Sequence, residues 1–366
     1  MKLKNNYNEC ITNLACSIRK YFGLNYNHNT LNYIDKILDE RNPRNVVVIL
    51  FDGMGSNILD KVLTSNSFFI KNRIKTITTV FPATTVAATT SIRTGLNPSE
   101  TGMLGWNMYY KDIDKTITTF FNYEKGDPQR KPLKEAADYK QKNMKEQTIV
   151  EEINNGKLYK GYELFPFGED PYSDFDEMIN KIEKLCKQKG KKYIYAYDEE
   201  PDHAMHEFGC DNKSVYDLIR YRNIMVEKLS KKLKDTLIVV IADHGHINVE
   251  NIFLNDYPKI KNMLLRTTSL ETRAVNLFVK DEYKDEFAKI FNDNFKDDFE
   301  LCSKQNVIDS KLFGDGVENE IFRDALGDYI AIAKNNKNLI DDGDEILKSQ
   351  HAGYTDDEIN IPLIVI

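Results

Sequence analysis

Two continuous apolar segments constrain the fold of this chain most strongly, because each ends abruptly at an aspartate. Residues 46–51 read Val-Val-Val-Ile-Leu-Phe and precede Asp52, whereas residues 237–242 read Leu-Ile-Val-Val-Ile-Ala and precede Asp243. A run without polar alternation is typical of a strand buried on both faces of a parallel sheet. Both aspartates would then lie at the carboxyl edge of the sheet, where open α/β folds bind their ligands.

Helical segments alternate with such strands along the chain. Apolar residues at helical spacing predict helices at 8–22, 30–40, 179–189, 213–234 and 281–292, and shorter apolar runs predict strands at 193–197 and 274–279. This alternation indicates a mostly parallel sheet sandwiched between crossover helices. We therefore predict an α/β fold that forms a single catalytic domain over residues 1–366.

Two stretches do not follow the alternation of helix and strand. Residues 107–160 are polar and charged, and residues 250–345 are acidic and rich in helix, with a strand at 329–333. We predict that both are inserted segments that form a cap near the carboxyl edge of the sheet.

Charge and cysteine content restrict the partners and the compartment. The formal net charge of −7 argues against a nucleic acid polymer as a partner, because binding to a phosphate backbone requires a basic face. The five cysteines are odd in number and include no Cys-x-x-Cys pair, which favours free thiols in a reducing compartment. No signal peptide or membrane-spanning segment is recognisable. These features predict a cytoplasmic protein that binds no membrane; they leave its oligomeric state open.

Five of the six histidines lie in three short segments, at 198–206, 242–246 and 349–353, and the first two also contain aspartate. Histidine and aspartate together are the ligand set of catalytic zinc. Asp202 and His206 are four residues apart and would share one face of a helix. Each segment alone is equally well explained as a turn or a surface loop. The combination predicts a metal site.

A threonine-rich segment at 78–98 adds a candidate nucleophile. Val86 to Ile92 are small and apolar, as in a buried helix that ends near Gly95. Thr84 and Thr85 would then lie at the helix N-terminus, where free N–H groups favour an anion such as phosphate. The alternative is that these hydroxyls only cap the helix.

The order of these motifs resembles the alkaline phosphatase superfamily, in particular its type I phosphodiesterase/nucleotide pyrophosphatase branch. The resemblance rests on FDGMG with Asp52, FPATT with Thr85, EEPDHAMH with Asp202 and His206, ADHGH with Asp243 and His244, and QHAGY with His351. It implies an alkaline-phosphatase-like core and a metal-dependent phosphoester hydrolase, most simply a phosphodiesterase or nucleotide pyrophosphatase.

The resemblance also implies a cofactor of two zinc ions, with manganese as an alternative. One ion would be bound by Asp202, His206 and His351, and the other by Asp52, Asp243 and His244. His203 and His246 match no ligand position of the family, and we interpret them as structural side chains or as neighbours of the ligands.

Thr85 is the nucleophile that the resemblance implies. The nucleophile of the family lies nine residues before the threonine of a Thr-Gly pair, and counting back from Thr94 gives Thr85 rather than Thr84. It would attack phosphorus and form a covalent phosphothreonine intermediate, which water then hydrolyses. The substrate would be a small phosphorylated compound, with a nucleotide as one candidate.

Two departures from the family pattern leave the nucleotide specificity open. The Phe-Pro pair lies upstream of the threonine, and Trp106 stands about where the family has a substrate-binding asparagine. The adjacent Asn107 is able to substitute for it. Trp106, Tyr109 and Tyr110 could stack on a base or aryl group, or pack beneath the cap. We name Trp106 and Asn107 as candidate substrate contacts.

Several alternatives use the same site. A phosphomonoesterase would need more positive charge around the phosphate, and Arg93 lies in the apparent buried helix. A phosphonate hydrolase remains an alternative, as does a phosphate-transferring mutase, since the C-terminal HAGY and IPLIV segments also resemble that branch. A non-catalytic binding module is a further alternative. The absence of a Cys/Ser-x-Pro-x-Arg motif argues against a sulfatase.

Overall fold

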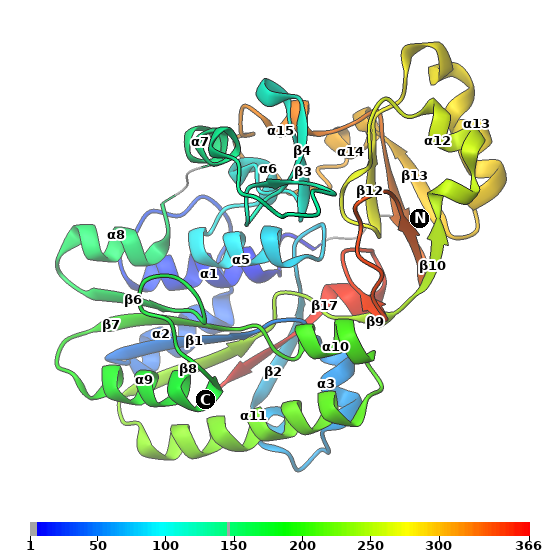
Figure 1. Cartoon of the computed structure of the whole chain (residues 1–366). Helices are drawn as coiled ribbons and strands as arrows, with labels where there is room; N and C mark the ends of the chain where they lie inside the picture. The colour runs from blue at the N-terminus through cyan, green and yellow to red at the C-terminus, as the bar shows by residue number, and fades with distance from the viewer. Residues whose placement is uncertain (1–5, 145–146) are drawn as a thin grey trace.

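A six-stranded sheet forms the centre of the molecule (Figure 1). The computed structural model describes residues 6–144 and 147–366. The strands of the central sheet lie in the order β2 (Arg73–Thr78), β17 (Asn360–Val365), β8 (Thr236–Ile241), β1 (Asn45–Phe51), β7 (Lys192–Asp198) and β6 (Lys160–Leu164). The last four run parallel, and β17 runs antiparallel to both of its neighbours. The predicted mostly parallel α/β fold is confirmed.

The apolar segments of the sequence form the middle of this sheet. Every residue of β1 and β7 is buried, as a strand covered on both faces requires. The parallel register pairs Phe51 with Asp198 and Leu50 with Ile241. The carboxyl ends of β1, β7 and β8 therefore meet at one edge of the sheet.

Helices cover both faces of the central sheet (Figure 1). On one face lie α1 (Ile11–Tyr21), α2 (Asn32–Arg41), α5 (Thr85–Thr94) and α8 (Ile149–Gly156). On the other lie α3 (Ser56–Val62), α4 (Phe68–Asn72), α9 (Phe175–Lys187) and α11 (Lys213–Lys232). The helix α9 shows how sequence sets the bounds: the Asp174 carboxylate accepts a hydrogen bond from Glu177 N–H, which caps its first turn.

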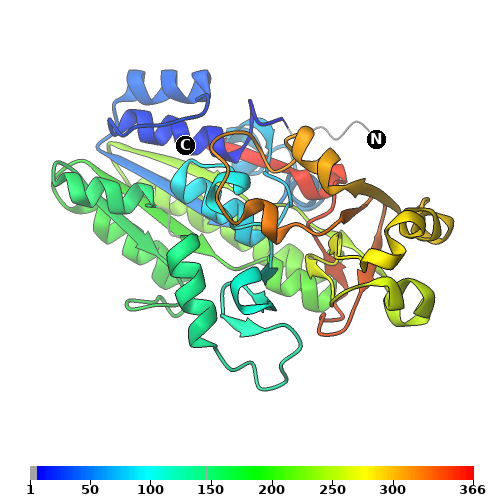
Figure 2. The ribbon, with the colours of Figure 1, turned by 90° about the horizontal axis from the view of Figure 1, so that it is seen from above.

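A second sheet lies beside the carboxyl edge of the first and is antiparallel throughout (Figure 2). Its strands follow the order β13 (Phe299–Ser303), β14 (Tyr329–Ala333), β12 (Ala274–Leu277), β11 (Ser269–Leu270), β3 (Asn107–Tyr110), β4 (Lys115–Thr118) and β5 (Tyr123–Glu124). The prediction that residues 274–279 continue the parallel alternation is wrong. Only a tight turn separates β11 from β12, and without a crossover helix two neighbouring strands must run antiparallel.

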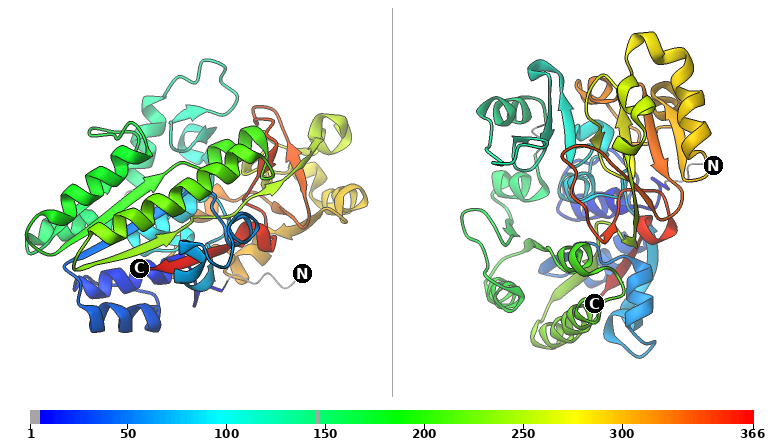
Figure 3. Two further views of the ribbon diagram at one scale, coloured as in Figure 1. Left: turned by 90° about the horizontal axis from the view of Figure 1, so that it is seen from below. Right: turned by 45° about the vertical axis from the view of Figure 1, so that its right-hand side comes forward.

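Further helices and two strand pairs complete the chain, which Figure 3 shows from two more sides. They are the strand pairs β10 (Glu250–Phe253) with β15 (Lys337–Ile340) and β9 (Ile247–Asn248) with β16 (Ser349–Gln350), and the helices α6 (Pro98–Thr101), α7 (Lys134–Asn143), α10 (Asp202–Phe208), α12 (Pro258–Met263), α13 (Lys284–Phe295), α14 (Lys304–Asp309), α15 (Phe322–Ala325) and α16 (Asp356–Ile359). The second sheet draws on both predicted inserts, although α8 at 149–156 packs on β6 of the central sheet. The assignment of 107–160 and 250–345 as cap segments stays a prediction.

Two further predictions from the sequence concern the state of the cysteines and the presence of a membrane-spanning segment. All five cysteines are free and buried. In the part of the chain that the structure describes, no helix has both the length and the apolar character to span a bilayer. The cytoplasmic location stays a prediction.

One fully buried ion pair joins the second sheet to the central one. Arg273, just before β12, donates from Nε and Nη2 to the two carboxylate oxygens of Glu358 in α16, at 2.6 and 2.8 Å, and both side chains are 0% exposed. Glu358 also accepts hydrogen bonds from the backbone N–H groups of Gly353 and Thr355. The loop that carries His351 is therefore held by the same carboxylate.

We expect Arg273→Met to reduce the free energy of unfolding by about 3–5 kcal/mol, because it leaves the Glu358 carboxylate buried without its partner. Urea unfolding followed by circular dichroism measures the change. Arg323→Met is the matched control, since Arg323 pairs with Glu318 at the surface and its loss is expected to cost under about 1 kcal/mol. Equal losses in the two variants would contradict the assigned role of the buried pair.

Candidate metal centre

Two clusters of histidine and aspartate lie next to each other at the carboxyl edge of the central sheet. The inner cluster consists of Asp52, Asp243 and His244, all of which are buried, and the outer cluster of Asp202, His206, His246 and His351. In each cluster every residue offers a ligand atom within 4.8 Å of the others. These separations are of the size expected for groups that share one metal ion.

The inner cluster is built from the ends of two adjacent parallel strands. Asp52 follows β1, and Asp243 and His244 follow β8. Backbone N–H groups of Gly53 and His244 donate to Asp243 Oδ1 at 3.0 and 2.9 Å, which fixes that carboxylate. His244 Nε2 lies 3.2 Å from Asp52 Oδ1. Neighbouring strands thus bring together residues almost two hundred positions apart.

Glycine at two positions permits this close approach. Gly53 has a φ of +70°, and a Cβ there would lie 3.0 Å from the Cβ of Asp202. A Cβ on Gly245 would lie 1.9 Å from the carbonyl oxygen of Asp357. Packing therefore requires glycine at both positions, and the positive φ of Gly53 requires it there a second time.

The outer cluster combines one helix with a loop from the far end of the chain. Asp202 and His206 lie one turn apart on α10, with His206 Nε2 3.3 Å from Asp202 Oδ2, so the prediction that they share a helix face is confirmed. His351 follows β16, and its Nδ1 lies 3.0 Å from the carbonyl oxygen of Ala83. The ring of His351 stacks on that of His244 at 3.8 Å between centroids, which joins the two clusters.

Thr85 is the first residue of α5 and faces the inner cluster. Its Oγ1 lies 3.2 Å from His244 Nε2 and 3.4 Å from Asp52 Oδ2. Thr84 is the N-cap residue, and its hydroxyl donates to Glu271 Oε1 at 2.6 Å, away from the clusters. The predicted buried helix and its end at Gly95, which has a φ of +79°, are confirmed.

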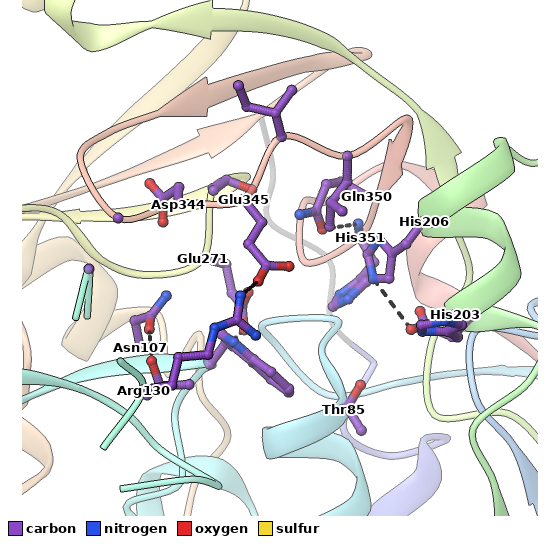
Figure 4. A pocket seen from close by; sticks show the side chains of 18 of the residues that line it. Thr85, Asn107, Arg130, His203, His206, Glu271, Asp344, Glu345, Gln350 and His351 are labelled. Atoms are coloured by element: carbon purple, nitrogen blue, oxygen red, sulfur yellow. Dashed lines mark hydrogen bonds and ion pairs between the residues drawn. The ribbon is translucent and has the colours of Figure 1, made fainter. Parts of the chain in front are cut away.

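A pocket of about 800 Å³ opens onto Thr85 and the outer cluster (Figure 4). Trp106 and Asn107 line it, as does Glu271. Arg130 reaches across the pocket to pair with Glu345 (Figure 4). The inner cluster lies beneath this lining, so Thr85 is the group that connects the pocket to it.

The inner cluster carries more buried negative charge than its own residues balance. Burial, and then the charge of Asp202, raise the pKa of Asp52 well above its usual range. Burial, and then the charge of Asp52, do the same for the pKa of Asp243. Among the residues that the structure describes, none donates a hydrogen bond to Asp243 Oδ2. Buried carboxylates and imidazoles that converge in this way fit a divalent cation in each cluster.

The six residues predicted as metal ligands are divided between the clusters as the family resemblance implied, while their binding of metal stays a prediction. His246 lies within the outer cluster, whereas His203 is exposed at the pocket. Tyr110 is buried and stacks on Tyr139 at 4.4 Å, and Tyr109 packs against Phe278. These two tyrosines therefore serve packing.

Two residues of the site were not predicted from the sequence. Tyr197, next to the last residue of β7, donates its hydroxyl to Asp52 Oδ2. Glu271 lies in the turn between β11 and β12 and accepts hydrogen bonds from Thr84 Oγ1 and from Trp106 N–H, the latter at 2.7 Å. Sheet register is the only signal that could have indicated Tyr197, and the turn around Glu271 contains no recognisable motif.

Burial raises the pKa of Glu271 to about 7, although the hydrogen bonds from Thr84 and Trp106 act in the opposite direction. The carboxyl group keeps its proton to a higher pH when the protein is folded than when it is unfolded. Its contribution to stability is therefore complete below about pH 4.5 and is lost as the pH rises to about 7.

We expect metal-free Glu271→Gln protein to gain stability relative to wild type between pH 5 and pH 8, by up to roughly 3 kcal/mol. The amide is uncharged at every pH and can still accept both hydrogen bonds. Chemical denaturation at several pH values in the presence of a chelator measures the difference. A difference that does not change with pH would show that Glu271 titrates normally.

The central sheet and its flanking helices form an alkaline-phosphatase-type fold, and the paired clusters and Thr85 lie at the carboxyl edge of that sheet. A family model described as type I phosphodiesterase / nucleotide pyrophosphatase matches residues 46–346. The chain therefore belongs to the type I phosphodiesterase / nucleotide pyrophosphatase family and is a hydrolase that acts on phosphoester bonds. The family is metal-dependent, and both clusters offer candidate ligands.

Solved structures with the same fold include murine ectonucleotide pyrophosphatase / phosphodiesterase 5, with a TM-score of 0.67. An inactive threonine-to-alanine variant of the murine protein in complex with AMP gives 0.66, and the human protein gives 0.63. Each is 17% identical, and the match covers 87% of both chains. A search of curated protein sequences finds no match.

Proposed function

We propose that this protein is a phosphodiesterase of the nucleotide pyrophosphatase type that uses Thr85 as its nucleophile at a site for two zinc ions, with manganese as an alternative. The position of Thr85 Oγ1 carries the proposal, because it lies 3.2 Å from His244 and faces the pocket that contains the outer cluster. The inactivation of a structural relative by a threonine-to-alanine substitution also supports it.

Asp202, His206 and His351 would bind one ion, and Asp52, Asp243 and His244 the other. When bound, the two ions supply the positive charge that lowers the pKa of the attacking hydroxyl and stabilises the leaving oxygen. Asp243 is fixed by two backbone N–H groups, and Asp52 by Tyr197, so these ligands are orientated before the substrate arrives.

Thr85 then performs a double displacement at phosphorus. Its Oγ forms a bond to phosphorus while the bond to the leaving oxygen breaks, and the leaving group departs as an alcohol with the proton that the threonine loses. A water molecule next attacks phosphorus and breaks the bond to Thr85, which releases a phosphomonoester and restores the hydroxyl. The N-terminal N–H groups of α5 favour the negatively charged oxygens throughout.

The charge around the pocket favours a diester over a monoester. Arg93, the residue considered for a phosphomonoesterase, donates to both oxygens of Glu163 at 2.8 and 3.0 Å and does not line the pocket. Arg130 is paired with Glu345, and Glu271 adds a carboxylate. A phosphodiester carries one negative charge where a monoester carries nearly two, so it suits this pocket better.

A nucleotide is the substrate candidate that the family and the pocket support. Trp106 lines the pocket and makes edge contacts with Phe120 and Phe121, which hold its ring for stacking on a base or aryl group. Asn107 Oδ1 accepts a hydrogen bond from Thr118, which leaves its amide group to donate to a phosphate oxygen. A structural relative has been solved in complex with AMP.

We expect Thr85→Ala to reduce zinc-dependent hydrolysis of bis-p-nitrophenyl phosphate by at least about a thousandfold, because the attacking group is lost. Thr84→Ala is the matched control, since the Thr84 hydroxyl bonds to Glu271 and does not face the clusters. It is expected to keep activity to within about tenfold. Initial rates of p-nitrophenol release measure both variants.

The same assay with p-nitrophenyl phosphate tests the choice between ester classes. We expect a lower kcat/KM for the monoester than for the diester. Preference for the monoester would favour the phosphomonoesterase alternative. Full activity in Thr85→Ala with loss in Thr84→Ala would overturn the assignment of the nucleophile.

We expect a chelator to abolish hydrolysis and added zinc to restore it, with about two ions bound per chain. Asp243→Asn removes one charge of the inner cluster and is expected to reduce the zinc content to about one ion per chain. Metal analysis of dialysed protein by mass spectrometry measures this. Bound zinc without turnover of any phosphoester would indicate the binding-module alternative, and absence of bound metal would contradict the proposal.

A further inference from the structure

Three of the four histidines in the two clusters turn the same ring nitrogen, Nδ1, toward a backbone carbonyl oxygen. The Nδ1 atoms of His206, His244 and His351 lie 2.9–3.0 Å from the backbone carbonyl oxygens of Ser349, Gly245 and Ala83, respectively. A carbonyl can only accept, so each Nδ1 carries the proton and each Nε2 keeps a lone pair. This is the usual arrangement of a histidine that binds metal through Nε2.

His246 has the opposite arrangement. Its Nε2 lies 2.5 Å from Asp202 Oδ1, and its side chain is 0% exposed. Among the described residues, no group lies within hydrogen-bond reach of its buried Nδ1. A neutral ring must carry its proton on Nε2, because the other tautomer would bury an unpaired N–H and set a lone pair against the carboxylate.

The two oxygens of Asp202 consequently have different surroundings. Oδ1 faces His246, whereas Oδ2 lies 3.3 Å from His206 Nε2, on the side of the cluster where the metal-binding lone pairs converge. An aspartate that gives one oxygen to an ion needs a donor for the other, and without one the carboxylate can rotate about its Cβ–Cγ bond.

We propose that His246 is a positioning residue, which donates from Nε2 to Asp202 Oδ1 and thereby turns Oδ2 toward the ion of the outer cluster. It is not a fourth ligand, although it lies among them. This inference rests on the proposed metal site. It leaves the outer ion with three protein ligands and a position open for substrate, as catalytic zinc sites require.

Two substitutions of His246 distinguish a hydrogen-bond donor from a residue that only fills space and from a metal ligand. His246→Met has a similar volume and no donor, whereas His246→Gln offers an amide N–H near the position of Nε2. Both are made in the full-length protein and in an Asp243→Asn background, where zinc bound to the outer cluster is measured alone. Chelator competition on metal-free protein gives the zinc dissociation constants.

We expect His246→Met to weaken zinc binding to the outer cluster about tenfold to a hundredfold, the effect typical of losing a group that orients a ligand. His246→Gln is expected to stay within about threefold of wild type, and binding to the inner cluster should not change. His203→Met is the control, because His203 is exposed at the pocket. Thermal unfolding of the metal-free variants confirms that each is folded.

Equal weakening in His246→Gln and His246→Met would overturn the proposal, because it would mean that the imidazole binds the ion itself. Wild-type affinity in His246→Met would overturn it as well. Either result with normal diester hydrolysis in wild type would leave the proposed function intact. A wild-type protein that binds neither zinc nor manganese would overturn both.

Discussion

Buried negative charge at one edge of the central sheet is the constraint on which this structure depends. Parallel strands bring the carboxylates of Asp52 and Asp243 together beneath Thr85, where water cannot screen them. Their raised pKa values express the cost of that arrangement. Since an apolar replacement would be easier to fold, the proposed cations would explain the carboxylates, and ion binding would return the lost stability to the folded state.

The second sheet contributes to this edge although it contains none of the candidate ligands. Arg273 joins it to Glu358, whose carboxylate also accepts from the backbone of the loop that carries His351. The ring of His351 stacks in turn on His244 of the inner cluster. The outer cluster therefore depends on correct docking of the two sheets, and a change far from the pocket could disturb the proposed metal binding without touching a candidate ligand.

Residue spacing in the sequence predicted the features that depend on neighbouring residues alone. The strand ending at Asp52, and the helix face shared by Asp202 and His206, follow from residue spacing and were confirmed. The strand predicted at 274–279 lies in the second sheet and not in the central one. The prediction failed because strand pairing depends on the length of the connection more than on composition. Tyr197 and Glu271 could not be predicted, since sheet register and a tight turn bring them to the site. The orientation of the His246 ring likewise could not be predicted from the sequence.

In the proposed function, the reaction and the choice of substrate depend on different sheets. The carboxyl edge of the central sheet supplies the clusters, and α5 supplies Thr85. Trp106, Asn107 and Glu271, in contrast, come from the ends of β3 and β11, two inner strands of the second sheet. Glu271 contacts both parts, because it accepts from Thr84 and from the backbone of Trp106. It thereby fixes the pocket wall against α5, the helix that bears the proposed nucleophile Thr85. If the proposed function is correct, this carboxylate suits the wall to esters of low charge, so we expect changes in the wall to alter the substrate while leaving the reaction at phosphorus the same.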